Sequence, residues 1–253
     1  MKDSFYITLF SNASGREHPT NTPSSFRTKL SKRIVCCEEY EVALCELQFP
    51  NTLCNVYGRS GTTWIYDGPK NMFRSILPQT YYFDINEMFN TITNDLENKI
   101  ELTLENNRVK CSPKTDDISI RFSDTLAKQF GFLRGEHEFK FGTMLAPGTP
   151  NLNLGLQTQF TVLTNIVKSQ LHGSGAVQSL RTSVFDLESY SYGKQGKVSF
   201  SRLQYILVSL LTFNEINIDI VDEYGEELSF LGGTSSVVLH PIASVLPPRA
   251  FDR

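Results

Sequence analysis

The segment from residue 215 to residue 240 constrains the fold of this chain more than any other. Isoleucine recurs at every second position from Ile216 to Ile220, between polar residues, which is the pattern of a strand with one face on a core and one face in water. Asp222 to Gly225 has the composition of a tight turn, and alternation resumes in Glu227–Phe230 and in Ser236–His240. We therefore expect an antiparallel meander, which needs a second sheet to cover its apolar face.

Further segments with strand patterns lie on both sides of the middle of the chain. They include Ser4–Phe10, Phe26–Leu30 and Glu39–Phe49 near the start, and Phe160–Lys168 and Ala176–Val184 in the second half. About eight antiparallel strands joined by loops of uneven length favour a two-sheet sandwich of the jelly-roll kind over a barrel. The predicted fold is thus mainly β.

One long strand has an irregular pattern. Leu44 and Leu47 cannot share a face in an unbroken strand, so the phase of the alternation shifts near Cys45. We expect a bulge or a bend there.

The middle of the chain changes from strands to a mixed pattern. Asp84 and Glu87 form a capping pair for a helix with one apolar stripe, which runs through about Lys99. Ser123 caps a second short helix, and Gly131 is placed to end it in a left-handed turn. Between the helices, three short strands are predicted at Ile100–Leu104, Arg108–Cys111 and Asp117–Phe122.

These elements suggest an inserted unit. Residues 80–142 form a compact α+β unit, and residues 1–79 and 143–253 supply the N-terminal and C-terminal strands of one discontinuous jelly-roll domain. The segment Ser11–Ser25 is polar and rich in turn residues, and the tail from Pro247 has no pattern. We expect both to order only on a neighbouring molecule.

The sequence has no recognisable catalytic or metal-binding arrangement. The four histidines, His18, His137, His172 and His240, are far apart and lack metal-ligand spacing. The five cysteines are odd in number, without CxxC pairs or a preceding signal peptide, so we expect reduced thiols in a protein made inside the cell. We predict no enzymatic activity and no cofactor.

Charge and hydropathy exclude two further classes of function. The net charge is −3, so no overall basic field exists to hold nucleic acid. The longest apolar run, Tyr205–Phe213, is far below the roughly 20 residues that cross a bilayer. We expect neither a nucleic-acid partner nor a membrane span.

Several segments together resemble a known family. They are Ser4–Ser14, Asn21–Phe26, Tyr40–Pro50, Ser123–Phe132, Asn165–Arg181 and Glu215–Leu239. In the same order along the chain, they are similar to segments of the penton (minor capsid) proteins of Polinton/Maverick elements and adintoviruses. The resemblance covers nearly the whole chain.

The resemblance implies a structural role. It implies a jelly roll that assembles as a homopentamer and occupies the fivefold vertices of an icosahedral capsid, beside a major capsid protein, so that the protein is part of the virion. The alternative is a receptor- or glycan-binding sandwich, suggested by the aromatic loop at Tyr190 and Tyr192 and by the inserted unit. The candidate interface residues are Asn21, Thr22, Ser24, Ser25, Phe26, His172, Tyr190 and Tyr192.

Overall fold

The computed structural model divides the chain into two compact units. It describes residues 4–36, 39–57, 60–68, 71–133, 140–157, 159–172, 175–185 and 191–243. One unit is formed by Met1–Thr52 together with Gln157–Arg253, and the other by Leu53–Leu156.

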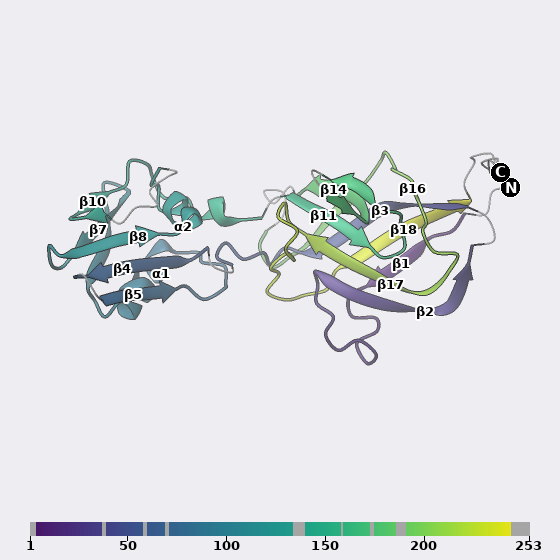
Figure 1. Ribbon diagram of the computed structural model, residues 1–253, viewed down its shortest axis with the longest axis horizontal. Coiled ribbons are helices and arrows are strands. Elements are labelled where there is room, and N and C mark those ends of the chain that lie inside the picture. Colours follow the sequence, from purple (N-terminus) through teal and green to yellow (C-terminus); the bar gives the residue numbers. More distant parts are fainter. Residues whose placement is uncertain are drawn as a thin grey trace. The chain divides into compact units, whose positions relative to one another are not determined.

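The first unit is a jelly roll (Figure 1). Its eight main strands are β1 (Ile7–Phe10), β2 (Ser25–Val35), β3 (Tyr40–Pro50), β11 (Gln159–Thr164), β14 (Ser179–Val184), β15 (Gln195–Ser199), β17 (Thr212–Val221) and β18 (Ser236–Ala243). They form two sheets with the orders β1-β18-β3-β15 and β14-β11-β17-β2, and β16 (Ile206–Leu207) also pairs with β3. The first strand pairs with the last, the second with the seventh, the third with the sixth and the fourth with the fifth, all antiparallel. This is the order of a long hairpin rolled into two sheets, which confirms the predicted fold class.

The predicted meander is wrong, although the predicted inward faces hold. Ile216, Ile218 and Ile220 are fully buried in β17. However, β17 and β18 lie in different sheets, and the residues between them form only isolated bridges, one of which joins Val221 and Glu227. The chain crosses from one sheet to the other between β17 and β18. The apolar face of β17 therefore packs against the sheet that contains β18 and β3.

The irregularity predicted near Cys45 is a bulge. Val238 of β18 is opposite Glu46 of β3, and Leu239 is opposite Leu44. Cys45 is therefore the extra residue on the bulged strand. The bulge keeps the side chains of Leu44 and Leu47 on the same buried face.

The second unit contains two small sheets and two helices. One sheet has the order β5-β4-β8-β9, and the other has the order β10-β7-β6. The elements are β4 (Thr62–Asp67), β5 (Asn71–Ile76), α1 (Ile85–Asp95), β6 (Ile100–Glu105), β7 (Arg108–Pro113), β8 (Ile118–Phe122), α2 (Asp124–Gln129), β9 (Lys140–Phe141), β10 (Met144–Leu145) and a short 3₁₀ helix, η1 (Leu152–Gly155).

The predicted bounds of the inserted unit, 80–142, are too narrow. The strands β4 and β5 pair with each other and β4 pairs with β8, so all three belong to the inserted unit rather than to the jelly roll. The β-branched and aromatic residues of β4 and β5 are typical of strands, but they do not specify the sheet that these strands join.

The helices begin as predicted. The Asp84 side chain accepts a hydrogen bond from the backbone N–H of Asn86 at 2.9 Å. The Ser123 side chain accepts a hydrogen bond from the backbone N–H of Leu126. Helix α1 ends at Asp95, earlier than predicted, because Glu97 and Asn98 have positive φ.

Gly131 follows α2 with φ of +84°, as predicted. Any Cβ at this position would lie 2.4 Å from the carbonyl oxygen of Gly148, so only glycine fits.

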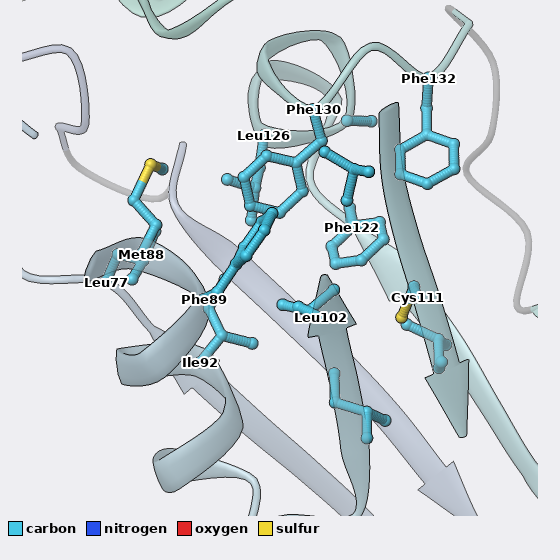
Figure 2. Close-up of a cluster of buried hydrophobic side chains, with 14 of the residues drawn as sticks. Leu77, Met88, Phe89, Ile92, Leu102, Cys111, Phe122, Leu126, Phe130 and Phe132 are labelled. Carbon is cyan, nitrogen blue, oxygen red and sulfur yellow. The ribbon is translucent and has the colours of Figure 1, made fainter. Parts of the chain in front are cut away.

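The inserted unit has a core of its own, shown in Figure 2. The ring of Phe130 meets those of Phe89 and Phe122 edge to face, at centroid distances of 5.4 and 5.5 Å. Met88 and Ile92 of α1 point into the same cluster (Figure 2). The helix, the loop after α2 and the inner faces of both sheets are therefore packed together.

Candidate protein-interaction site

The polar segment Ser11–Ser25 makes ordered contacts within its own chain. The backbone N–H of Ser11 donates to the carbonyl of Ser235 at 2.9 Å, and the backbone N–H of Ser235 donates to the Ser11 hydroxyl at 3.0 Å. The imidazole Nε2 of His18 lies 3.2 Å from a carboxylate oxygen of Glu215. These contacts hold the segment against its own unit, so the expectation that it orders only on a neighbour is wrong.

Two of the candidate interface residues are part of the jelly roll's own interior. Phe26 is 1% exposed and Ser24 is 2% exposed. The hydroxyl of Ser24 donates to the carbonyl of Leu228. Their assignment to an interface is therefore corrected, because Phe26 lies on the inward face of β2, where alternation places it with Thr28.

Three neighbouring candidates remain at the surface but have partners within the chain. Asn21 makes two hydrogen bonds to the backbone of Arg27, and Thr22 closes a turn with the backbone of Ser25. The hydroxyl of Ser25 donates to the Asp219 carboxylate at 2.6 Å. These contacts fix the start of β2.

The other three candidates lie in two separate segments of the chain. His172 lies in β12 (Gln170–His172), which pairs with β13 (Gly175–Val177), and only its backbone is described. Tyr190 lies outside the described residues, and Tyr192 is partly exposed. Tyr192 lies just before β15, at the end of the sandwich where β1 ends and the Ser11–Ser25 segment begins. The strand β12 lies beyond the C-terminal end of β11, which is at the opposite end of the sandwich.

The described part of the chain contains no group of three His, Cys, Asp or Glu residues that could hold a metal ion. The ring of His240 stacks on that of Tyr6 at 4.5 Å, and its Nδ1 is 2.8 Å from the Tyr205 hydroxyl. This histidine is thus held between two tyrosines at the surface. Within the described residues, no helix is long and apolar enough to cross a membrane.

Three of the described thiols have raised pKa values. Burial raises the pKa of Cys111 to about 12. Burial also raises the pKa of Cys54, and burial followed by the charge of Glu46 raises that of Cys45. A reactive cysteine needs a lowered pKa, so these side chains act as small apolar groups.

One hollow of about 200 Å³ lies on the jelly roll. Its lining residues are Thr161, Leu163, Val177, Val221, Asp222, Glu223, Tyr224 and Gly225. The Asp222 carboxylate accepts hydrogen bonds from the side chain of Gln157 and from the backbone N–H groups of Tyr224 and Glu226. This carboxylate is engaged within the protein, so it stabilises the turn.

The outer face of the sheet β5-β4-β8-β9 is the most distinctive exposed surface of the inserted unit. In one row across the sheet, Met72 is opposite Tyr66, Tyr66 is opposite Ser119, and Ser119 is opposite Phe141. The side chains of Met72, Tyr66 and Phe141 are 57%, 37% and 69% exposed.

In the next row across the same sheet, Trp64 is opposite Arg74 on one side and Arg121 on the other. The Arg121 guanidinium lies 5.1 Å from the centre of the Trp64 ring. We call this surface the Trp64 face, and it consists of Trp64, Tyr66, Met72, Arg74, Ile76, Arg121 and Phe141.

Sequence reasoning missed the Trp64 face. The signal was the presence of large apolar residues on both faces of β4 and β5, with Trp64 and Tyr66 alternating with the buried Thr63 and Ile65. Such a pattern predicts a strand that is buried on both faces. Among the described residues, however, no layer covers the outer face of this sheet.

The strand order and the inserted unit together define a jelly-roll β-sandwich protein that carries an α+β insertion between its third and fourth main strands. No protein family model and no curated protein matches the chain.

Among solved structures, the chain is similar to the mavirus penton protein, with a TM-score of 0.49 and 12% identity over 96% of this chain and 100% of that one. It is also similar to a chain of the Sputnik virophage structure, with a TM-score of 0.47 and 12% identity over 95% of this chain and 98% of that one. At this low identity and these TM-scores, function has to be derived from the chain's own residues.

Proposed function

We propose that the protein is a structural minor capsid (penton) protein, which forms homopentamers at the fivefold vertices of an icosahedral capsid and contacts a major capsid protein there. The observation that carries the proposal is the position of the segments that resemble the penton family. Ser4–Ser14 covers β1, Tyr40–Pro50 is β3, and Glu215–Leu239 contains most of β17 and the first half of β18. These strands are the ones that define the rolled order of the sandwich.

Exposed apolar side chains at one end of the jelly roll support assembly. Thr212 at the start of β17 is opposite Val35 at the end of β2, and the N–H of Cys36 donates to the carbonyl of Leu211 at 2.8 Å. Val35 is 59% exposed and Leu211 is 79% exposed, with Leu210 beside them. We call these three residues the Leu211 patch. Apolar side chains grouped at a surface are typical of protein contacts.

A ring needs a particular kind of interface. In a closed fivefold ring, each subunit uses two different surfaces, one for each neighbour, and each contact has to bury about 1,000 Å² or more to be specific. The Leu211 patch can supply only part of one such contact. The rest of the surface comes from other parts of both subunits.

Sedimentation velocity of the full chain over a range of concentrations tests the proposal, together with electron microscopy of the same samples. We expect fivefold rings and, with the major capsid protein added, co-assembly. The substitution Leu211→Asp should weaken the rings, while Asn214→Asp, a change of an exposed residue three positions further on, should leave them intact. Wild-type protein that stays monomeric at high concentration and does not co-assemble would refute the proposed function.

The alternative, a receptor- or glycan-binding sandwich, rests on the aromatic loop of Tyr190 and Tyr192 and on the inserted unit. Tyr190 lies outside the described residues and Tyr192 is only partly exposed. The alternative therefore stays a prediction.

A further inference from the structure

The Trp64 face has the composition of a protein contact. An antiparallel sheet that covers a core on one side usually has polar side chains on the other side. Here the uncovered side carries Trp64, Tyr66, Met72 and Phe141. Tyrosine, tryptophan, methionine and arginine are enriched at protein interfaces, and tryptophan, tyrosine and arginine dominate the binding energy.

The charges of the Trp64 face predict an acidic partner. Arg74 and Arg121 both lie on this face, and no carboxylate does so among the described residues of the four strands. The nearest carboxylate on β4, Asp67, lies on the opposite side of the strand and is paired with Lys99 at 2.5 Å. A surface that docks on the Trp64 face therefore has to carry carboxylates that pair with the guanidinium groups of Arg74 and Arg121.

The area of the Trp64 face limits the kind of partner. Four strands spaced about 4.8 Å apart, with a length of about 20 Å for six residues, give a face of roughly 300 Å². A stable complex buries about 800 Å² on each partner. The face is too small to hold an independent partner, but it is large enough for a partner that other contacts already keep in place. A second copy of this chain in a ring satisfies that condition.

The same unit offers a complementary surface on its other side. Helix α1 packs its buried residues Met88 and Phe89 into the core, which also receives Ile65 and Ile120 from the inner face of the sheet. The exposed side of α1 therefore faces away from the Trp64 face, and in Figure 1 the strands β4 and β5 overlie the helix.

The exposed side of α1 is acidic. It carries Glu87 among asparagines, and the helix contains no Lys or Arg. The carboxylate of Asp95 accepts a hydrogen bond from the Ser75 hydroxyl of β5 at 2.7 Å, so it lies on the side of the helix next to the sheet. The N-cap Asp84, also exposed, adds a carboxylate at the start of the helix.

We propose that the Trp64 face of one subunit docks on the acidic side of α1 in the next subunit of the ring. This inference rests on the proposed homopentamer and adds the contact between the inserted units. A closed ring requires two different surfaces on each copy, because each copy binds one neighbour with each of them. The Trp64 face and the exposed side of α1 are two such surfaces, and their charges are opposite.

The chain contains a single tryptophan, so the fluorescence of Trp64 reports on this face directly. Acrylamide quenching is measured for wild-type rings and for the monomers obtained by dilution or by Leu211→Asp. We expect a quenching constant roughly twofold or more lower in the ring, because docked side chains exclude water and solutes from the centre of a contact. Equal quenching in rings and monomers overturns the inference while the proposed function stands.

A charge exchange tests the partner surface. Arg74→Glu and Glu87→Arg should each raise the dissociation constant of the ring by about tenfold or more, and the double variant should recover most of the loss, because it restores opposite charges across the contact. Arg108→Glu, on β7 of the other sheet, is the matched control and should change the constant by less than about twofold.

If both single variants weaken the ring and the double variant does not recover, the assignment to α1 is wrong. If neither single variant has an effect, the docking surface is wrong. If the wild-type protein forms no rings at all, the proposed function fails first, and this contact fails with it.

Discussion

Phe130→Ala should destabilise the inserted unit strongly and leave the jelly roll folded. Phe130 is fully buried, and its ring makes edge-to-face contacts with Phe89 and Phe122 (Figure 2). Truncating a buried phenylalanine to alanine removes apolar burial and leaves a cavity, which together cost about 3–5 kcal/mol. Each aromatic pair adds about 0.5–1.5 kcal/mol beyond its buried area, so the upper part of that range applies.

The two units can be monitored separately. Trp64 lies in the inserted unit, so its fluorescence follows the unfolding of that unit, while far-ultraviolet circular dichroism follows both units. In a domain of about 100 residues, a loss of 1 kcal/mol lowers Tm by about 4–8 °C. We therefore expect the transition seen by Trp64 to fall by well over 10 °C, and the transition of the jelly roll to keep its midpoint.

The control for this experiment is Leu133→Ala, which truncates a side chain that is 66% exposed on the same unit. Its effect should stay within about 0.5 kcal/mol. A loss below about 1 kcal/mol for Phe130→Ala would show that the aromatic cluster is not tightly packed. An equal shift of both transitions would show that the units unfold together.

Two further predictions concern the core and the pH dependence of stability. Ile218→Asp places a charge in the centre of the jelly roll, where Ile218 is fully buried, and should cost several kcal/mol; rings that still form with this variant would contradict the inward assignment of β17. Burial raises the pKa of Cys111 to about 12, above its usual value near 8.5, so its contribution to stability is complete below about pH 8.5 and is lost as the pH rises toward 12. Urea titrations between pH 8 and pH 11 should show a steeper alkaline loss of stability for the wild type than for Cys111→Ala, and parallel curves would argue against the deep burial of this thiol.

Several features could be predicted from the sequence because they depend on neighbours along the chain. The caps at Asp84 and Ser123, the left-handed Gly131 and the bulge at Cys45 are each decided by a few consecutive residues. Such features follow from backbone geometry and the phase of alternation.

The candidate interface residues were harder to predict. The polar composition of Ser11–Ser25 predicts an arm that includes Ser24, yet long-range contacts of Ser24 with Leu228 and of Ser25 with Asp219 fix the start of β2. A polar composition shows that a segment avoids the core, but it does not show whether the segment has partners elsewhere in the same chain.

The segment 215–240 shows the division between sequence and tertiary structure. Its alternation determined that Ile216, Ile218 and Ile220 point inward, because the period of a strand is a local property. Only the tertiary structure decided that β17 pairs with β2 and β11 while β18 pairs with β1 and β3, since strand pairing joins residues far apart in the chain. The same long-range pairing placed β4 and β5 in the inserted unit and left the Trp64 face uncovered, which no local pattern specifies.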